Sequence, residues 1–211
     1  MSSKDLSSHR RNYVKHELTE EKISQNPFEQ FGWWFDDVVK AEMMDPNAMV
    51  LATATKGAKP SARMVLLKSF DEKGFVFYTN YHSRKGKELE ENKQASLLFY
   101  WGDLERQVRI EGTVEKTEAH LSEEYFSNRP YESRLSAIVS EQSEEIPNRQ
   151  FLEDKLEEVR ASGSTKRPEN WGGYILKPTY FEFWQGRASR LHDRLVFVPE
   201  NGGWKIKRLA P

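Results

Sequence analysis

The sequence predicts a mainly β protein, an antiparallel barrel-like sheet decorated by helices. About eight short stretches are rich in β-branched and aromatic residues, which is typical of strands. Turn-forming residues at Gly57, 71–74 and 201–203 join several of these stretches as hairpins, and hairpins make antiparallel pairs. Segments of helical period lie between the hairpins instead of following every strand, which indicates a closed β sheet with inserted helices.

The N-terminal segment differs from the rest of the chain. Residues 1–26 are polar and show no clear period, so we expect a mobile arm, with a helical stretch near Arg10–Leu18. Residues 27–211 have the length of a single domain. Its first helix should open at Asn26-Pro27 and run to about Met44, because large apolar residues recur there at helical spacing.

The remaining elements follow from apolar runs and turn signals. The predicted strands are Ala48–Thr55, Pro60–Phe70, Phe75–Thr79, Ala95–Trp101, Gln107–Lys116, Gly173–Trp184, Arg190–Pro199 and Gly203–Leu209. The predicted helices are Ser83–Asn92, Glu118–Asn128, Tyr131–Val139 and Asn148–Ala161.

Composition excludes several classes of function. The formal net charge of −1 argues against nucleic-acid and anionic-membrane binding, which leave a basic footprint. The chain has no Cys, no apolar run of membrane-spanning length and no apolar core near its start, so we expect a cytoplasmic protein. The five histidines lack metal-ligand spacing, so no metal site is predicted. GxSxG, GxGxxG and P-loop motifs are absent.

Phe183–Arg194, FWQGRASRLHDR, is the most cationic short segment, with Asp193 as its one opposing charge. If the following strand begins near Arg190, then Arg190, His192 and Arg194 share one face, and an anion or an aromatic ring should lie among them. The polar outer face of a sheet explains the same pattern equally well.

Ser83-Arg84-Lys85 opens a short helix with its cations at the positive end of the helix dipole. A phosphate bound at that N-terminus would turn this unfavourable placement into a favourable one. The alternative is a solvated helix with Lys–Glu pairs, and we favour the phosphate.

Two further patterns carry cations in suggestive places. Arg63–Lys68 is an apolar strand with a cation at each end, although snorkelling of both side chains to solvent is at least as good an explanation. Tyr125, Arg129 and Ser133 recur every four residues, and Pro130 should place them at a helix–helix corner. They could clamp a phosphate, but the spacing alone favours an incidental arrangement.

Taken in order, these segments resemble the pyridoxine/pyridoxamine 5′-phosphate oxidase family from about Arg10 to Pro211. The motifs that carry the resemblance are RRNY at 10–13, DPNAM at 45–49, RMVLLK at 63–68, FYTN at 77–80, SRK at 83–85, ERQVRIEG at 105–112, YFSNRP at 125–130, QS at 142–143, FWQG at 183–186, RLHDR at 190–194 and WKIKRLAP at 204–211. No single motif decides the resemblance, but the ordered set is specific.

The resemblance implies an FMN-binding split barrel that works as a homodimer with the flavin at the subunit interface. The implied FMN-binding residues are Arg63, Met64, Val65, Leu66, Leu67, Lys68, Tyr78, Thr79, Arg84, Lys85, Gln107, Gln142, Ser143, Trp184 and Arg194. The implied substrate-binding residues are Arg10 and Tyr13 from the arm, with Lys68, Tyr125, Arg129, Ser133, Arg190, Leu191 and His192. Arg190 and His192 are the implied catalytic pair, which would hold the substrate's ring over the flavin.

The activity implied is oxidation of pyridoxine or pyridoxamine 5′-phosphate to pyridoxal 5′-phosphate, with hydride transfer to the flavin and O₂ reduced to hydrogen peroxide. We expect two separate cationic pockets, one for each ligand's phosphate. The expected pockets are Arg63/Arg84/Lys85/Ser143 for FMN and Lys68/Tyr125/Arg129/Ser133 for the substrate. The alternatives are a split-barrel relative that binds flavin or haem and oxidises something else, and a nucleic-acid-binding module.

Overall fold

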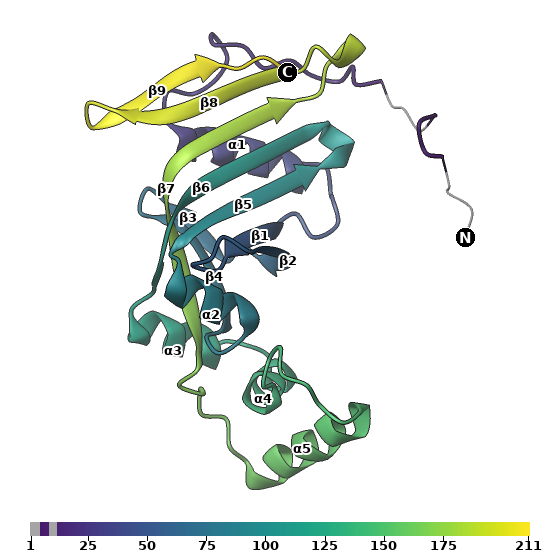
Figure 1. The fold of residues 1–211 in the computed structure, drawn as a ribbon, viewed down its shortest axis with the longest axis vertical. Coiled ribbons are helices and arrows are strands. Elements are labelled where there is room, and N and C mark those ends of the chain that lie inside the picture. The colour runs from purple at the N-terminus through teal and green to yellow at the C-terminus, as the bar shows by residue number, and fades with distance from the viewer. Residues whose placement is uncertain (1–4, 9–11) are drawn as a thin grey trace. The chain divides into compact units, whose positions relative to one another are not determined.

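The computed structural model describes residues 5–8 and 12–211, and these residues form two compact units (Figure 1). The terminal unit comprises the described residues up to Pro46 together with Leu98–Ile110 and Tyr180–Pro211. The central unit comprises Asn47–Leu97 and Glu111–Thr179. Three strands pass from one unit into the other: β5 (Gln94–Trp101), β6 (Arg106–Lys116) and β7 (Trp171–Gln185).

Helix α1 (Pro27–Lys40) supplies the core of the terminal unit. Asn26 caps it by accepting a hydrogen bond from the Phe28 N–H, and proline occupies the first helical position, where no N–H is needed. Its buried side chains recur at helical spacing and meet aromatic rings of the strands, as the 5.3 Å between the Trp34 and Phe183 ring centroids shows. The helix ends at Lys40 instead of Met44, because Glu42 and Asp45 adopt positive φ angles.

The last two strands of the terminal unit, β8 (Asp193–Glu200) and β9 (Gly203–Arg208), form an antiparallel hairpin. Asn201 and Gly202 make its two-residue turn, and both have positive φ, as the tight turn of a twisted hairpin requires. β8 also pairs antiparallel with the end of β7, which places Trp184 opposite Arg194.

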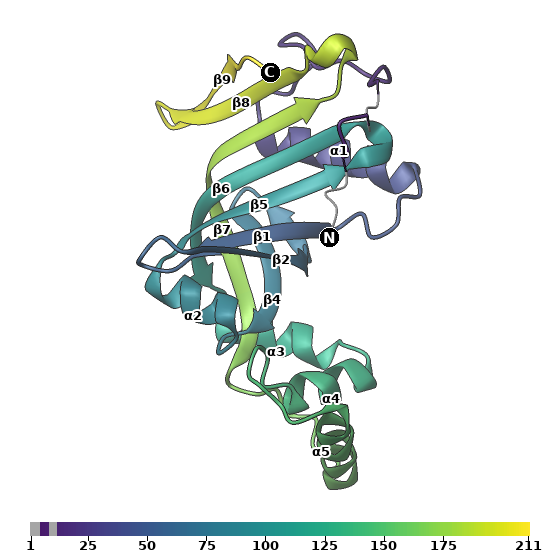
Figure 2. The same ribbon diagram turned by 45° about the vertical axis from the view of Figure 1, so that its right-hand side comes forward.

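The central unit combines hairpins with four helices. β1 (Ala48–Ala54) pairs with β2 (Pro60–Leu66), and β3 (Ser69–Asp71) pairs with β4 (Gly74–Asn80), which also pairs with the start of β7; every pairing is antiparallel. The helices are α2 (Arg84–Glu91), α3 (Ala119–Ser127), α4 (Tyr131–Val139) and α5 (Arg149–Ser162). Figure 2 shows α3, α4 and α5 grouped together at one end of this unit.

The predicted antiparallel sheet with inserted helices is confirmed, with nine strands in the described residues in place of about eight. The predicted strand Pro60–Phe70 is wrong as one element. It is two strands, because the Leu67 and Lys68 N–H groups donate to Asn47 O at 2.9 Å and Val76 O at 2.8 Å. The change of partner turns the Leu67 side chain into the core.

The expected helical stretch at Arg10–Leu18 is also wrong over its described part, Asn12–Leu18. The backbone there bonds to side chains instead of to itself, since Val14 N and Lys15 N both donate to the Glu105 carboxylate, at 2.9 and 3.1 Å. Across the described residues, none of the helices is long and apolar enough to cross a membrane.

Candidate active site

A cavity of about 640 Å³ lies in the central unit, between β2, β4, the start of β7 and the helices α2, α3 and α4. It is lined by eleven residues that the sequence analysis assigned to a site: Arg63, Met64, Val65, Leu66, Lys68, Tyr78, Thr79, Lys85, Tyr125, Arg129 and Gln142. It is also lined by five that the sequence analysis did not single out: Asn80, Ser136, Ala137, Ser140 and Trp171. The cavity joins side chains that are more than one hundred residues apart in the sequence, from Arg63 to Trp171.

Lys85 projects from the first turn of α2, and its ammonium is buried among neutral acceptors. Its Nζ lies 2.6 Å from Gln142 Oε1, 3.2 Å from Thr79 Oγ1 and 3.3 Å from Ser83 Oγ. Burial, aided by the nearby charge of Arg63, lowers the pKa of Lys85 to about 8. In the described chain, none of the hydrogen-bond partners of this ammonium is a carboxylate. The ammonium is therefore suited to bind an anionic ligand.

Arg129 lies at the corner between α3 and α4, as Pro130 predicts. Its guanidinium carbon is 4.7 Å from the ring centroid of Trp171 and 5.9 Å from that of Phe126. Its Nη1 is buried and has no hydrogen-bond partner in the described part of the chain, and burial lowers its pKa. A buried donor without an acceptor costs free energy, so this group also fits an anion that enters the cavity.

Aromatic rings form one wall of the cavity. The Tyr78 and Tyr125 rings stack at 3.9 Å with an interplanar angle of 12°, and Trp171 is stacked 5.6 Å from Tyr78. Lys68, which follows β2, adds an exposed ammonium for which the described residues provide no carboxylate within ion-pair distance. Flat apolar walls with unpaired cations at their edge suit a planar ligand that carries a phosphate.

Arg63 is held in a different way from these cations. Its Nη2 lies 3.2 Å from the buried Glu88 carboxylate, and its Nη1 donates to Leu51 O at 3.1 Å. Burial raises the pKa of Glu88, but hydrogen bonds from Ser61, Thr53 and Arg84, together with the charge of Arg63, bring that pKa down to about 2. Glu88 therefore stays charged and fixes Arg63 at the cavity wall.

Three residues predicted for the two phosphate pockets do not line this cavity. Arg84 and Ser143 line a neighbouring pocket of about 460 Å³, where Arg84 Nε donates to Glu88 at 2.9 Å. Ser133 lies in the first turn of α4, while Ser136 on the same helix and Ser140 at its C-cap line the cavity. The remaining members of the two expected pockets all line one cavity, and their division between two phosphates stays a prediction.

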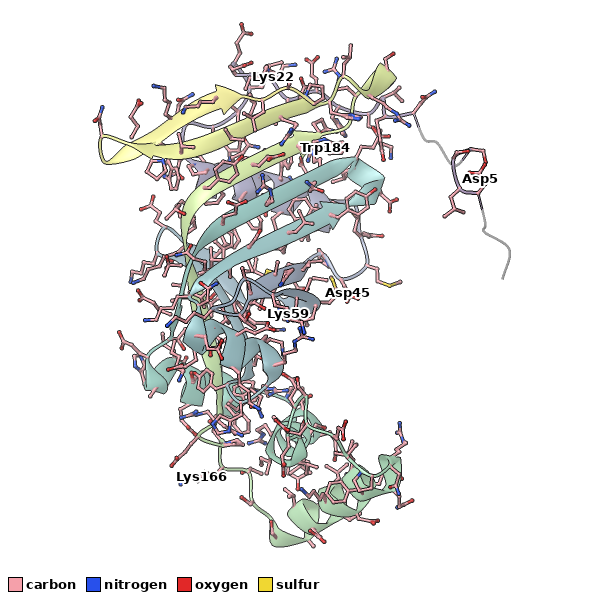
Figure 3. All side chains as sticks on the ribbon, in the orientation of Figure 1. Asp5, Lys22, Asp45, Lys59, Lys166 and Trp184 are labelled. Atoms are coloured by element: carbon pink, nitrogen blue, oxygen red, sulfur yellow. The ribbon has the colours of Figure 1, made fainter. Side chains whose placement is uncertain are left out.

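Apart from Leu67, whose side chain is buried in the core of the central unit, the other predicted site residues belong to the terminal unit. Tyr13, Trp184 and His192 form a ring cluster, with His192 4.7 Å from Trp184 and 5.7 Å from Tyr13 between centroids. Figure 3 labels Trp184, which lies near the end of β7. His192 Nδ1 accepts a hydrogen bond from the Arg187 N–H, and burial, aided by the charge of Arg190, lowers the pKa of His192. Gln107 lies on β6 in the same unit. Arg10 lies outside the described residues.

The predicted face of Arg190, His192 and Arg194 is wrong. β8 begins at Asp193, and Ser189 and Arg190 before it have φ angles of 56° and 61°, so strand alternation does not reach back to Arg190. Arg190 and Leu191 are exposed instead. Arg194 pairs with the buried Glu182, at 2.9 Å from Nε and 3.1 Å from Nη2, and this hydrogen bonding raises the pKa of Arg194.

Trp171 is the most informative lining residue that sequence reasoning missed. The structure pairs the Trp171-Gly172-Gly173 start of β7 with Tyr78-Thr79-Asn80. A Cβ on Gly173 would lie 2.9 Å from a Tyr78 ring carbon, so only glycine lets the Tyr78 ring pack there. An aromatic residue followed by two glycines at the start of a strand was the available signal.

Comparisons with known proteins agree with this geometry. Residues 35–163 match the family model described as pyridoxamine 5′-phosphate oxidase, and residues 171–211 match the one described as a pyridoxine 5′-phosphate oxidase C-terminal dimerisation region. Together the two models cover most of the chain, including both units.

Individual relatives are similar over nearly the whole chain. A Bordetella pertussis protein named pyridoxine/pyridoxamine 5′-phosphate oxidase is 53% identical over 100% of both chains. The chloroplastic oxidase 1 of Arabidopsis thaliana is 54% identical over 98% of this chain, which spans 41% of that protein's length. The crystal structure of PhzG from Burkholderia lata, in complex with tetrahydrophenazine-1-carboxylic acid, superposes with a TM-score of 0.89 at 31% identity, covering 95% of this chain and 100% of that one. The predicted split-barrel fold is therefore confirmed.

Proposed function

Because the chain belongs to the pyridoxine/pyridoxamine 5′-phosphate oxidase family, we propose that it converts pyridoxine 5′-phosphate or pyridoxamine 5′-phosphate to pyridoxal 5′-phosphate, using bound FMN and O₂ and releasing hydrogen peroxide. The observation that carries the proposal is a single aromatic-walled cavity with cations at separate points, Lys85 at α2 and Arg129 at the α3–α4 corner. Neither has a carboxylate partner among the described residues. Two phosphorylated ligands, FMN and the substrate, would supply the missing anions.

The residues present fit FMN. Lys85 and Arg63 would hold its phosphate at the N-terminus of α2, with Arg84 and Ser143 reaching it from the neighbouring pocket. The backbone of Arg63–Lys68, with Tyr78, Thr79 and Gln142, would contact the rest of the molecule. When bound, FMN supplies a two-electron acceptor, which the side chains of this protein do not provide.

The substrate's phosphate would bind at the other cations of the cavity. Arg129 offers a buried unpaired donor, and Lys68 and Tyr125 line the same region. Ser133 would complete the set if its side chain turns from the first turn of α4 toward the phosphate. Holding the phosphate fixes the pyridine ring, and orientation of bound reactants is a large part of what such a protein contributes to the rate.

The remaining assignments concern residues of the terminal unit and come from the family resemblance of the sequence. We assign Gln107, Trp184 and Arg194 to FMN, and Arg190, Leu191 and His192 to the substrate, with Arg10 and Tyr13 closing over the site. Its lowered pKa keeps His192 neutral near pH 7, so it can accept or donate a hydrogen bond at the substrate without adding charge. Arg190 has an exposed side chain that is available to a ligand.

The match to a dimerisation region supports a homodimer of this chain. We propose that FMN binds at the interface between the two subunits, as expected from the sequence. We also propose a cytoplasmic location, for which the absence of Cys is suitable.

One set of assays tests the function. Purified protein should show a flavin absorption spectrum, and a peroxide-coupled assay should give turnover with both phosphorylated vitamers and far less with unphosphorylated pyridoxine or pyridoxamine. Protein that binds no flavin would contradict the proposal. Turnover of a phenazine-type carboxylic acid in preference to either phosphorylated vitamer would contradict the substrate assignment.

A further inference from the structure

The side chain of Arg129 has a fixed position in the fold although no acidic residue pairs with it. The residue follows α3, and its backbone N–H donates to Phe126 O at 3.1 Å, closing the end of that helix. No carboxylate of the described chain lies within ion-pair distance of its guanidinium, and its Nη1 is buried without an acceptor. A flexible side chain with no ion pair needs another contact to keep its donors aimed at one point.

Trp171 supplies that contact. Its ring centroid is 4.7 Å from the Arg129 guanidinium carbon, within the range of a cation–π interaction, and tryptophan is the strongest partner of this kind. The ring is nearly parallel to Tyr125 at 3° and to Tyr78 at 13°, so the three rings form one ordered stack in the cavity wall. Phe126 packs edge-on against Trp171 at 5.1 Å and fixes it from another side.

The backbone beneath Trp171 is held as firmly as its ring. Arg167 Nη1 donates to Trp171 O at 2.6 Å, while Arg167 Nε is paired with Glu123 on α3 at 2.9 Å. Trp171 N donates to Pro168 O at 3.1 Å, and two residues later Gly173 N donates to Ser122 Oγ on α3 at 3.0 Å. These bonds tie the start of β7 to the helix that precedes Arg129.

We propose that Trp171 is a positioning residue for the substrate's phosphate, acting through Arg129. Its ring holds the guanidinium at one place in the cavity. The Arg129 side chain therefore does not have to change rotamer before its unpaired donors bind the phosphate. The inference rests on the proposed function, because it assigns Arg129 to the substrate and not to FMN. It extends that function by one residue of the cavity wall, which acts on the phosphate through Arg129.

Two substitutions distinguish the effect of the aromatic ring of Trp171 from the effect of the volume that its side chain fills. Trp171→Met keeps an apolar side chain of some size but has no π face, whereas Trp171→Phe keeps a ring with a weaker π face. In the FMN-loaded enzyme, Trp171→Met should raise KM for pyridoxamine 5′-phosphate about 2- to 30-fold, the range of one cation–π contact. Trp171→Phe should raise it less, about 2- to 5-fold. kcat and the FMN content should change much less than KM in both.

Repeating the Trp171 substitution in the Arg129→Ala variant tests whether Trp171 acts through Arg129. There, Trp171→Met should leave KM within about twofold of Arg129→Ala alone, since the two residues act through one interaction. Trp204→Met is the matched control, because Trp204 packs on Phe28 and Phe181 in the terminal unit and does not line the cavity. It should lower stability without raising KM.

The outcomes distinguish this inference from the function it rests on. If Arg129→Ala raises KM and Trp171→Met does not, the positioning role is wrong and the function stands. An equal rise for Trp171→Met with and without Arg129 would also overturn the positioning role. If Arg129→Ala leaves KM unchanged, both assignments fail. If Trp171→Met does not retain FMN, the test rests on Trp171→Phe. An unchanged KM of Trp171→Phe would then reject the inference.

Discussion

Two cations of the terminal unit and two of the central cavity are in opposite situations. In the terminal unit, Arg106 pairs with Asp37 at 2.8 Å, and Arg194 forms two bonds to the buried Glu182. In the central cavity, Lys85 has only neutral acceptors and Arg129 has a buried donor without any, among the described residues. The first kind of cation is neutralised by a carboxylate of the fold, and the second kind is available to an anion from outside.

The free-energy costs explain why the difference is informative. A buried charge without a partner costs free energy, and the fold could remove that cost with an apolar residue or a carboxylate. Lys85 and Arg129 remain unpaired in a cavity of suitable size, which is expected where a ligand completes the pair. Arg63 lies between the two kinds, because it lines the cavity but is fixed by Glu88.

The largest expected effect is on stability, in the terminal unit. Glu182→Ala would leave Arg194 and Arg109 without their shared carboxylate, to which Arg109 donates at 2.6 Å. Breaking a buried ion pair on one side typically costs about 3–5 kcal/mol, and the partial exposure of both arginines should bring the loss toward the lower end. Urea unfolding measures it. A loss below about 1 kcal/mol would show that this pair does not stabilise the fold.

Arg129→Ala should act on substrate binding and not on the fold. Loss of a hydrogen bond to a charged group, about 1.5–3 kcal/mol, should raise KM for pyridoxamine 5′-phosphate roughly 10- to 150-fold and leave the FMN affinity nearly unchanged. Steady-state kinetics and flavin titration measure the two. Arg149→Ala, an exposed arginine on α5, is the control. Release of FMN by Arg129→Ala would show that the two phosphates are assigned to the wrong cations.

Lys85→Met should show the converse pattern. The same range, about 10- to 150-fold, should appear in the FMN dissociation constant, with little change in KM once the flavin is bound. The apoprotein should be no less stable than the wild type, because the substitution removes a buried unpaired charge. Lys73→Met, at the β3–β4 turn, is the control. A clear loss of apoprotein stability would place Lys85 with the structural cations instead.

The smallest expected effect is a pH dependence that also comes from Lys85. Its pKa of about 8 lies below the ordinary lysine value of 10.5, so its charged form destabilises the folded apoprotein. That penalty is present below pH 8 and disappears as the pH rises from 8 to 10.5. FMN affinity should fall over the same range, by at most tenfold per pH unit, because the phosphate binds the ammonium form. Isothermal titration should show proton uptake on FMN binding near pH 8.5, absent in Lys85→Met.

Most lining residues of the central cavity could be predicted from the sequence through the family resemblance, whereas the local patterns at 63–68 and 125–133 also had ordinary structural explanations. Tyr125 lies on α3 and Arg129 at the corner that follows it, so the four-residue spacing and Pro130 relate them, while the cations after Ser83 fall in the first turn of α2. The position of Arg84 in a neighbouring pocket depends on its ion pair with Glu88. That carboxylate also accepts hydrogen bonds from Thr53 on β1 and Ser61 on β2, so three elements must meet to form the group.

The error at Arg190 has a local cause that the sequence does not reveal. Ser189 and Arg190 adopt left-handed backbone conformations that non-glycine residues seldom take, so strand alternation was the better expectation from pattern. Trp171 was missed for another reason: its partner Arg129 is forty-two residues away, and no motif of known spacing connects them.

A crystal structure of the protein with FMN and pyridoxal 5′-phosphate would test the central claim most directly. The account predicts two phosphates in the central unit, one within hydrogen-bond distance of Lys85 Nζ and the other at Arg129 Nη1, with Trp171 still stacked on that guanidinium. Either phosphate bound only to arginines of the terminal unit that already have carboxylates, with Lys85 and Arg129 left unpaired, would contradict it.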